Sequence, residues 1–385
     1  MSRRGNGDGS IRQCADGRWE ATIRLAGRRY WFKGKTQADA RAKLHDFQKR
    51  YHLGQVVEPR RLTLGQYLDQ WLEAGTADWR PKTAHGYKSL IEMYWKPELG
   101  HVQLQRLTPA MLAASYAKWR PDRSGGTLLN VHRCLHRALV VAVRWGLVAR
   151  NVADAVEAPK ARRRRPLLWS VEQATQFLAA TRGDRWHVLW ALLLGTGCRL
   201  GEALALRWSD VDLATRTMVI QRSFVWAGNE RVEGEPKTLS GVRTLVLPPF
   251  AVSALQSWHK AQVAERLAMG PAWPEGDLIV TLPTGGVPTQ WQCRTAFHRA
   301  CRGADLPPIR RHDLRHLTAS VMLAQGLPLP AVARQLGHAT PAITAAVYSH
   351  ALMGADEQAA QALELTFQDR AICESPEDGV SQEGG

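Results

Sequence analysis

Residues His312 to Tyr348 read HDLRHLTASVMLAQGLPLPAVARQLGHATPAITAAVY, and the rest of the chain is best understood from this stretch. Arg315 lies three positions after His312, and His316 lies four positions after His312. Residues at these spacings lie on one face of an α-helix. The stretch therefore predicts a helix that presents two histidines and an arginine side by side.

Two glycines and a proline divide this stretch into three helices. Gly326 and Gly337 suit the left-handed cap that ends a helix, and Pro341 suits the first turn of the next one. His338 then lies at the C-terminal turn of the second helix, and Tyr348 lies about two turns into the third. Polar side chains able to do chemistry thus fall on three consecutive helices.

Composition indicates several domains and a polyanionic partner. The 385 residues exceed what one compact core holds and predict two or three domains. Hydrophobic residues make up 45% and charged residues 22%, an ordinary globular balance. The formal net charge is +16, which makes nucleic acid the default candidate for a partner.

The cysteines and the apolar runs indicate a cytoplasmic protein. The cysteines lack zinc-ligand spacing and read as reduced thiols; they are Cys14, Cys134, Cys198, Cys293, Cys301 and Cys373. No apolar run approaches the length of a membrane span, and no apolar segment follows the basic N-terminus. We expect no membrane contact and, given the GC-rich residue usage, a bacterial or phage origin with action in the bacterial cytoplasm, near the nucleoid.

Residues 1–57 predict a small domain of three strands and a helix. The segments GRWEATIRLAG and RRYWFKG alternate apolar and polar residues, and a helical segment follows Thr36. Arg24, Arg28 and Arg29 lie among the outward residues, and an arginine-rich sheet face fits a DNA groove. A merely solvated sheet face is the alternative.

Residues 58–160 predict a bundle of four to five helices, since apolar residues recur at helical spacing. Lys82, Arg133 and Arg137 fall off the apolar stripes and are candidate phosphate contacts, although each of them taken singly is more often a plain solvated residue. The segment APKARRRRP at 158–166 then carries Arg162, Arg163, Arg164 and Arg165 in a row. Such a run stays solvated or lies on phosphate, and we favour a connector that crosses DNA.

Residues 161–366, with the basic linker at their start, predict a mixed, mainly helical α+β domain. A buried helix is expected over Trp186–Leu194, a strand over 215–225, and two strands around a polar loop that holds Lys237. A further helix is expected over about 249–268. Residues 367–385 are acidic and polar, and we expect disorder there. The fold class is thus multidomain: a small sheet with a helix, an all-α bundle, and an α+β domain.

The chemistry-bearing residues suit phosphoryl transfer without a metal. Such a reaction depends on positioning and on stabilising negative charge. Two arginines can clamp the phosphate oxygens, histidines can donate or transfer protons, a lysine can protonate a leaving oxygen, and a tyrosine can be the nucleophile. The chain offers no carboxylate cage for Mg²⁺. A histidine metal cluster is the alternative, but the histidines lack the spacing and partners of known metal motifs.

Five motifs in order resemble the tyrosine recombinases of the phage integrase type. They are TGCRLGE at 196–202, PKT at 236–238, HDLRH at 312–316, LGH at 336–338, and Tyr348. The resemblance implies Arg199 and Arg315 as phosphate clamps, Lys237 as general acid in a β-hairpin, His312 and His338 as assisting histidines, and Tyr348 as nucleophile. It also implies a supporting role for Glu202, and His316 lies beside this set.

The resemblance extends more loosely over the rest of the chain. Residues 1–57 look like an arm-type DNA-binding domain, and residues 61–157 look like a helical core-binding domain. The implied activity is integration or excision of a mobile element by a homotetramer on double-stranded attachment sites, through a Holliday junction and without a cofactor. An excisionase or a DNA-bending accessory protein would be a further partner.

Two other readings stay open from the sequence. One is a DNA-binding architectural or regulatory protein on a recombinase scaffold, and the other is a type IB topoisomerase. The complete set of six catalytic candidates favours the enzyme over the first, and the arm-like N-terminal unit favours recombination over the second. The segment after Tyr348 is partly apolar and could pack on its own domain or dock on a neighbouring protomer.

Overall fold

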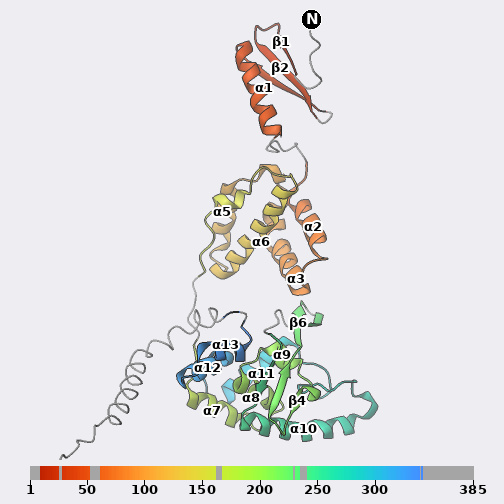
Figure 1. The fold of residues 1–385 in the computed structure, drawn as a ribbon, viewed down its shortest axis with the longest axis vertical. Coiled ribbons are helices and arrows are strands. Elements are labelled where there is room, and N and C mark those ends of the chain that lie inside the picture. The colour runs from red at the N-terminus through yellow and green to blue at the C-terminus, as the bar shows by residue number, and fades with distance from the viewer. Residues whose placement is uncertain are drawn as a thin grey trace, which may run out of the picture. The chain divides into compact units, whose positions relative to one another are not determined.

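The structure is a computed structural model that describes residues 9–25, 28–52, 61–161, 167–228, 230–234, 241–338 and 340. The chain divides into two units, Met1–Arg163 and Arg164–Gly385. Their elements are labelled in Figure 1.

The first unit begins with a three-stranded antiparallel sheet and one helix. The strands β1 (Ser10–Gln13), β2 (Trp19–Leu25) and β3 (Arg28–Gly34) pair in that order, and α1 (Gln37–His52) follows. Ala21 and Ile23 of β2 pack against Ala40 and Leu44 of α1. The alternation in the sequence thus produces a sheet with one apolar face against α1 and one polar face.

The helical part of the first unit contains four α-helices of ten or more residues and shorter helical segments. They are α2 (Leu64–Gly75), α3 (Pro81–Leu90), a π-helix (Ile91–Trp95), α4 (Lys96–Leu99), α5 (Pro109–Trp119), α6 (Gly125–Arg144), and 3₁₀ turns at Leu104–Arg106 and Val152–Ala155.

Side-chain caps set where these helices begin. Thr63 forms a capping box with Gln66 ahead of α2, and Thr108 caps α5. Helix α6 begins at Gly125, because Ser124 accepts a hydrogen bond from the Thr127 amide and caps it. The cap fixes the start of the long α6, whose Leu128, Leu135 and Leu139 are buried in the core.

The second unit combines helices with two small sheets. Its helices are α7 (Val171–Ala180), α8 (His187–Thr196), α9 (Leu200–Leu204), α10 (Pro249–Met269), α11 (Gln290–Gly303), α12 (Arg311–Ala324) and α13 (Leu329–Leu336), with 3₁₀ turns at Trp208–Asp210 and Gly270–Ala272. Its strands are β4 (Val211–Asp212), β5 (Thr217–Ile220), β6 (Ser223–Ala227), β7 (Glu230–Gly234) and β8 (Arg243–Val246).

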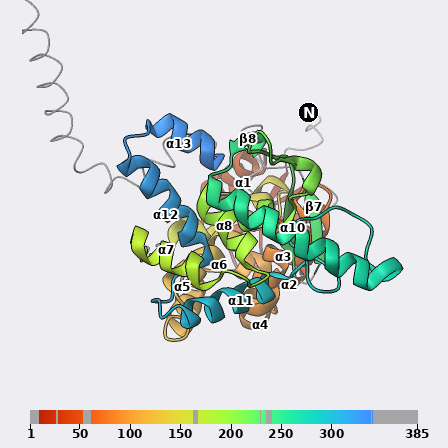
Figure 2. The same ribbon diagram turned by 90° about the horizontal axis from the view of Figure 1, so that it is seen from below.

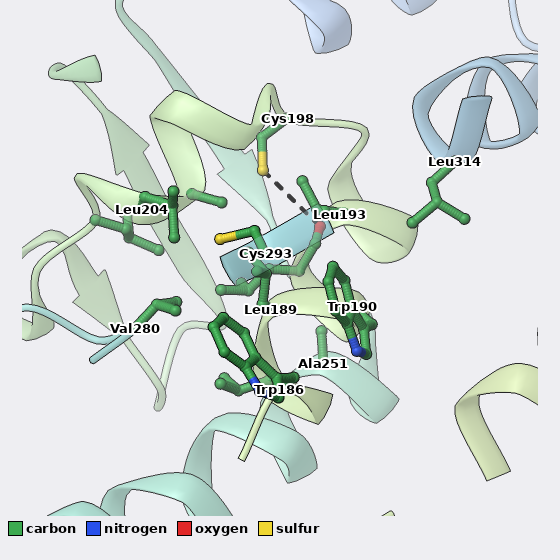
Figure 3. Packing of buried hydrophobic residues seen from close by; sticks show 14 of the residues in the cluster. Trp186, Leu189, Trp190, Leu193, Cys198, Leu204, Ala251, Val280, Cys293 and Leu314 are labelled. Atoms are coloured by element: carbon green, nitrogen blue, oxygen red, sulfur yellow. Dashed lines mark hydrogen bonds between the residues drawn. The ribbon is translucent and has the colours of Figure 1, made fainter. Parts of the chain in front are cut away.

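Helix α8 is the centre of this unit. It contacts α7, α9, α10 and α12, and Figure 2 shows it between α10 and α12. Its residues Leu189, Trp190 and Leu192 are fully buried, and Figure 3 shows Trp190 and Leu193 among side chains from several other elements. Because α8 is apolar on all sides, it fixes the elements that carry the polar candidates around it.

The expected strand over 215–225 is wrong in one respect, because it is two strands. Strand β5 pairs with β4 and β8, whereas β6 pairs with β7 in a separate sheet. The break falls at Gln221 and Arg222, whose side chains donate to the buried carboxylate of Asp210 at 2.6 Å and 2.5 Å. These bonds hold the two residues at which the chain passes from one sheet to the other.

Among the described residues, no helix has the length and apolar character needed to cross a membrane.

Candidate active site

Arg199 lies at the turn between α8 and α9. Gly197 ends α8 with a φ of 65°, and Arg199 is the N-cap of α9. Its side chain is 42% exposed. Its guanidinium donates to Glu202 Oε1 at 2.7 Å and to the Gly337 carbonyl at 2.9 Å. The turn therefore places an accessible guanidinium beside the end of α13.

Glu202 is the anion between Arg199 and Arg243, and these residues with the end of α13 form the Glu202 corner. Its side chain is 2% exposed, and its Oε2 accepts from the backbone N–H of Arg199 at 2.9 Å and from Arg243 Nη2 at 2.8 Å. Burial alone raises the pKa of Glu202, but the hydrogen bond and charge of Arg243, with those of Arg199, hold the pKa below its ordinary value. The carboxylate therefore stays ionised and can orient both arginines.

Arg315 lies on α12 and is only 3% exposed. It donates to the Gly197 carbonyl at 2.6 Å and to the Leu336 carbonyl at 2.5 Å. Burial, followed by the positive charge of Arg199, lowers the pKa of Arg315 to about 10. Two guanidinium groups therefore lie close together, as a clamp on one anion requires.

Three consecutive carbonyls at the end of α13 each accept from a different arginine. Gln335 accepts from Arg243 Nε at 2.9 Å, while Leu336 and Gly337 accept from Arg315 and Arg199 respectively. These bonds satisfy carbonyls that lack partners at a helix end. They fix the last turn of α13 directly before His338.

His312 and His338 approach the same place from α12 and from the end of α13. Burial, with the smaller effect of neighbouring positive groups that include Arg315 and Arg199, lowers the pKa of each to about 4. His316 stacks edge-on against His312, with 5.0 Å between ring centroids. Both assisting histidines are therefore neutral near pH 7 and able to accept a proton.

A cavity lies beside His338. It has a volume of about 610 Å³ and lies between β8 and α13, with Thr244, Val246 and Arg334 in its lining. Neither Arg199 nor Arg315 lines this cavity, so it adjoins the candidate site at His338 and does not contain the pair of arginines.

Lys237 and Tyr348 lie outside the described residues, so their expected roles stay predictions. The described ends of the lysine loop are β7, which finishes at Gly234, and Gly241, whose carbonyl accepts from Arg243 Nη1 at 3.0 Å. Gly241, the first described residue after the loop, therefore lies beside Arg243, the partner of Glu202.

The candidate DNA-contacting residues have varied surroundings. Arg24, Arg29, Lys82 and Arg133 are exposed. Arg137 is exposed as well, but its guanidinium also lies over the rings of Trp79 and Tyr87, at 6.0 Å and 5.7 Å. The side chain of Arg28 and the run of residues 162–165 lie outside the described residues.

Arg243 was not among the residues expected from the sequence. It takes an inward position in β8, together with Leu245, while Val242 and Val246 point outward and are more than half exposed. A charged residue on the apolar face of an alternating strand was the available signal. Its guanidinium completes the corner formed by Arg199, Glu202 and the end of α13.

In the part of the chain that the structure describes, no three His, Cys, Asp or Glu side chains are grouped to hold a metal ion. Burial raises the pKa of Cys198 and of Cys293 to about 11, so both thiols stay protonated. Among the described residues, the charged groups beside His338 therefore include the arginines and Glu202.

Comparison with known proteins agrees with this geometry. The phage integrase family model matches residues 170–354, and the model of the phage integrase N-terminal SAM-like domain matches residues 63–119. An integrase from Streptomyces ambofaciens is 30% identical over 365 residues, which cover 90% of this chain and 93% of that protein. The integrase of Mycobacterium phage L5 is 26% identical, over 78% of this chain and 79% of its own.

Solved structures share the fold. The Tn1549 transposon integrase in complex with transposon right end DNA superposes with a TM-score of 0.67 at 19% identity, covering 78% of this chain and 99% of that chain. A lambda integrase tetramer bound to a Holliday junction gives a TM-score of 0.55 at 17% identity, covering 88% and 94%. From its motifs, its site and these matches, the chain belongs to the phage integrase family and is a site-specific tyrosine recombinase.

Proposed function

We propose that this recombinase breaks and rejoins DNA through a 3′-phosphotyrosyl bond to Tyr348. Arg199 and Arg315 hold the scissile phosphate, Lys237 protonates the leaving oxygen, and the two histidines assist. The observation that carries the proposal is the convergence of two guanidinium groups and two neutral imidazoles at the end of α13.

The reaction is a transesterification at phosphorus. The tyrosine oxygen forms a bond to phosphorus while the bond from phosphorus to the 5′ oxygen breaks. The tyrosine proton passes to a neutral histidine, for which His312 is the candidate, and the 5′ oxygen takes a proton from Lys237. The phosphotyrosyl ester keeps the energy of the cleaved bond, so a 5′ hydroxyl from another strand can reverse the reaction without a nucleotide cofactor.

The distribution of tyrosines and lysines supports these assignments. Tyr348 is the tyrosine of the unit Arg164–Gly385, and all the others precede residue 117. Tyr67, Tyr94 and Tyr116 are buried, and burial raises the pKa of Tyr67 and Tyr116. Lys237 shares its unit with one other lysine, Lys260, which is exposed on α10.

DNA supplies the substrate and the partner surface. The neighbouring Tn1549 and lambda structures contain DNA, and one of them is a tetramer on a Holliday junction. By likeness to them, we propose that this chain acts as a homotetramer that exchanges strands through a Holliday junction on attachment sites. The product is integration or excision of a mobile element in a bacterial host, inside the cell and near the nucleoid, with an excisionase or DNA-bending protein setting the direction.

The domains have separate roles in this proposal. Residues 1–57 bind outlying arm sites, 58–160 bind the core site, and 161–366 catalyse, with the arginines at 162–165 lying along phosphate. Lys82, Arg133 and Arg137 are proposed core-site contacts. The acidic tail, 367–385, has no assigned contact.

The polar face of the N-terminal sheet suits a DNA groove. Arg24 and Arg29 are directly opposite each other on β2 and β3, and both are exposed. Like charges at such positions destabilise a sheet, but a polyanion between them reverses the effect. Trp31 on the same face is 58% exposed and offers apolar contact to bases.

Replacing the nucleophile tests the central step. Tyr348→Phe should retain DNA binding and abolish the covalent adduct with a suicide core substrate, because the attacking oxygen is gone. Tyr30→Phe is the matched control, since its buried hydroxyl has no hydrogen-bond partner among the described residues. Adduct formation by Tyr348→Phe would refute the assignment.

The lysine offers a second, independent test. Lys237→Ala should slow cleavage by about 100-fold or more, the usual effect of losing a general acid. Lys260→Ala removes the same charge from the same unit and should cleave normally. A protein that binds DNA but forms no adduct in its native sequence would instead favour the architectural alternative.

A further inference from the structure

Arg243 carries a buried charge that the mechanism above does not use. Its side chain is 5% exposed, against 2% for its partner Glu202. Burying such a pair costs several kcal/mol per ion unless further hydrogen bonds satisfy it, and an apolar residue often serves stability as well. Leu245 and Leu247 take the next inward positions of the same strand region. An apolar residue would therefore suit the core at position 243, so packing alone does not explain why an arginine is buried there.

The contacts of Arg243 reach three separate parts of the site. Nη2 donates to Glu202 at 2.8 Å, Nη1 donates to the Gly241 carbonyl at 3.0 Å, and Nε donates to the Gln335 carbonyl at 2.9 Å. Only a planar guanidinium can span all three at once, because its donors form a fixed fork. The side chain thus ties β8 to α9 and to the last turn of α13.

Gly337 leaves the space that this arrangement needs. A Cβ at Gly337 would lie 2.7 Å from Arg243 Nη1. The φ of Gly337 is 66°, which glycine adopts readily. The turn before His338 is therefore shaped around the Arg243 guanidinium as well as around its own backbone conformation.

We infer that Arg243 is a positioning residue for the phosphate clamp, acting on Arg199 through Glu202 and on the His338 turn through Gln335. It does not contact the phosphate. It holds Glu202 so that this carboxylate directs the Arg199 guanidinium. It also holds the Gln335 carbonyl, and the next two carbonyls along the chain accept from Arg315 and Arg199. The inference rests on the proposed clamp role of Arg199.

The test compares two substrates in single-turnover cleavage by the full chain. One carries the normal scissile phosphate, and the other carries a methylphosphonate, which lacks the negative charge that the clamp neutralises. Arg243→Met should cleave the phosphate about 100-fold more slowly, the scale of a displacement of about 1 Å in a reacting group. On the methylphosphonate, the ratio of the wild-type rate to the rate of Arg243→Met should be at least tenfold smaller than on the phosphate. The same should hold for Arg199→Ala.

A double variant tests whether Arg243 acts through Arg199. Arg199→Ala combined with Arg243→Met should be at most about 10-fold slower than Arg199→Ala alone, well short of the roughly 100-fold loss from Arg243→Met in the wild type, because only the route through Gln335 then remains. Arg243→Lys keeps the charge but cannot span three acceptors, so it should fall between the wild type and Arg243→Met. It also serves if the methionine variant does not fold, which thermal unfolding and core-site binding will reveal.

Three results would overturn the inference. The first is cleavage at the wild-type rate by Arg243→Met or, if that variant does not fold, by Arg243→Lys. The second is an equal loss of rate on both substrates, and the third is a double variant whose loss equals the product of the two single losses. Normal cleavage of the phosphate by Arg199→Ala would instead remove the proposed clamp on which the inference depends. The single Arg199 variant thus separates failure of the proposed function from failure of the inference.

Discussion

At the scale of single residues, Glu202 is the anion that joins two arginines of the site. It accepts hydrogen bonds from the side chains of Arg199 and Arg243 and from the Arg199 backbone while being almost wholly buried. A carboxylate in this position orders two cations that would otherwise repel each other. The polar site therefore depends on one anion.

Neutralising that anion should cost stability. Glu202→Gln should lower the free energy of unfolding by about 3 kcal/mol, because it leaves Arg243 buried beside a neutral amide. Glu157→Gln is the matched control, since Glu157 pairs with Lys160 on the surface and should change stability very little. Chemical denaturation of both variants checks this, and equal effects would contradict the account of Glu202.

The histidines make a prediction about pH. The pKa of His312 and of His338 is about 4 in the folded protein, below the value of 6.5 for an unperturbed histidine. Between these values the unfolded chain binds more protons, so stability falls as the pH falls from about 6.5 to about 4. Above pH 6.5 the two groups contribute no pH dependence.

Thermal unfolding of a double variant, His312→Asn with His338→Asn, measures that contribution. The wild type should lose more stability than the variant between pH 6.5 and pH 4. If the two proteins lost stability in parallel, the neutral state of these histidines would not be a property of the fold.

At the scale of elements, the polar face of the N-terminal sheet gives the clearest prediction. Arg24→Ala with Arg29→Ala should weaken arm-site binding and reduce the salt dependence, by about 0.9 in slope for each phosphate that is no longer neutralised. Arg41→Ala with Lys49→Ala removes the same charge from exposed positions on α1. Gel-shift titration at several salt concentrations distinguishes them, and an equal effect of both double variants would indicate net charge alone.

The sequence predicted those elements whose pattern is set locally. Thr63 and Thr108 cap α2 and α5, Pro249 begins α10, and Gly326 and Gly337 ended α12 and α13 as expected. The division of residues 215–225 into β5 and β6 was not predicted, because it depends on which other strands each of them pairs with. Sequence periodicity does not report such long-range contacts.

The residues of the candidate site divide in the same way. Arg199, Arg315, His312 and His338 could be named from the sequence because each belongs to a motif, and the structure brings them together. Arg243 belongs to no such motif, and its partners Glu202 and Gln335 are far from it in the chain. Its importance could be recognised only once three elements were placed together.

At the scale of the whole molecule, we propose that DNA recognition by the N-terminal domains is separate from chemistry in the second unit. The unit Met1–Arg163 carries the exposed basic sheet and the helices, whereas the arginine clamp belongs to Arg164–Gly385. We expect deletion of residues 1–57 to weaken binding to arm sites and to spare cleavage of a suicide core substrate. If cleavage fell as much as arm binding, the N-terminal domain would be part of the core clamp.

The most direct measurement for the whole account is the identity of the residue that becomes attached to DNA. The covalent complex with a suicide substrate would be digested with nuclease and trypsin and analysed by mass spectrometry. We expect a nucleotide joined through its 3′ phosphate to the tryptic peptide 335–370. The attachment should be at Tyr348, the one tyrosine of that peptide. Attachment to Ser349, or to a tyrosine of the unit Met1–Arg163, would contradict it.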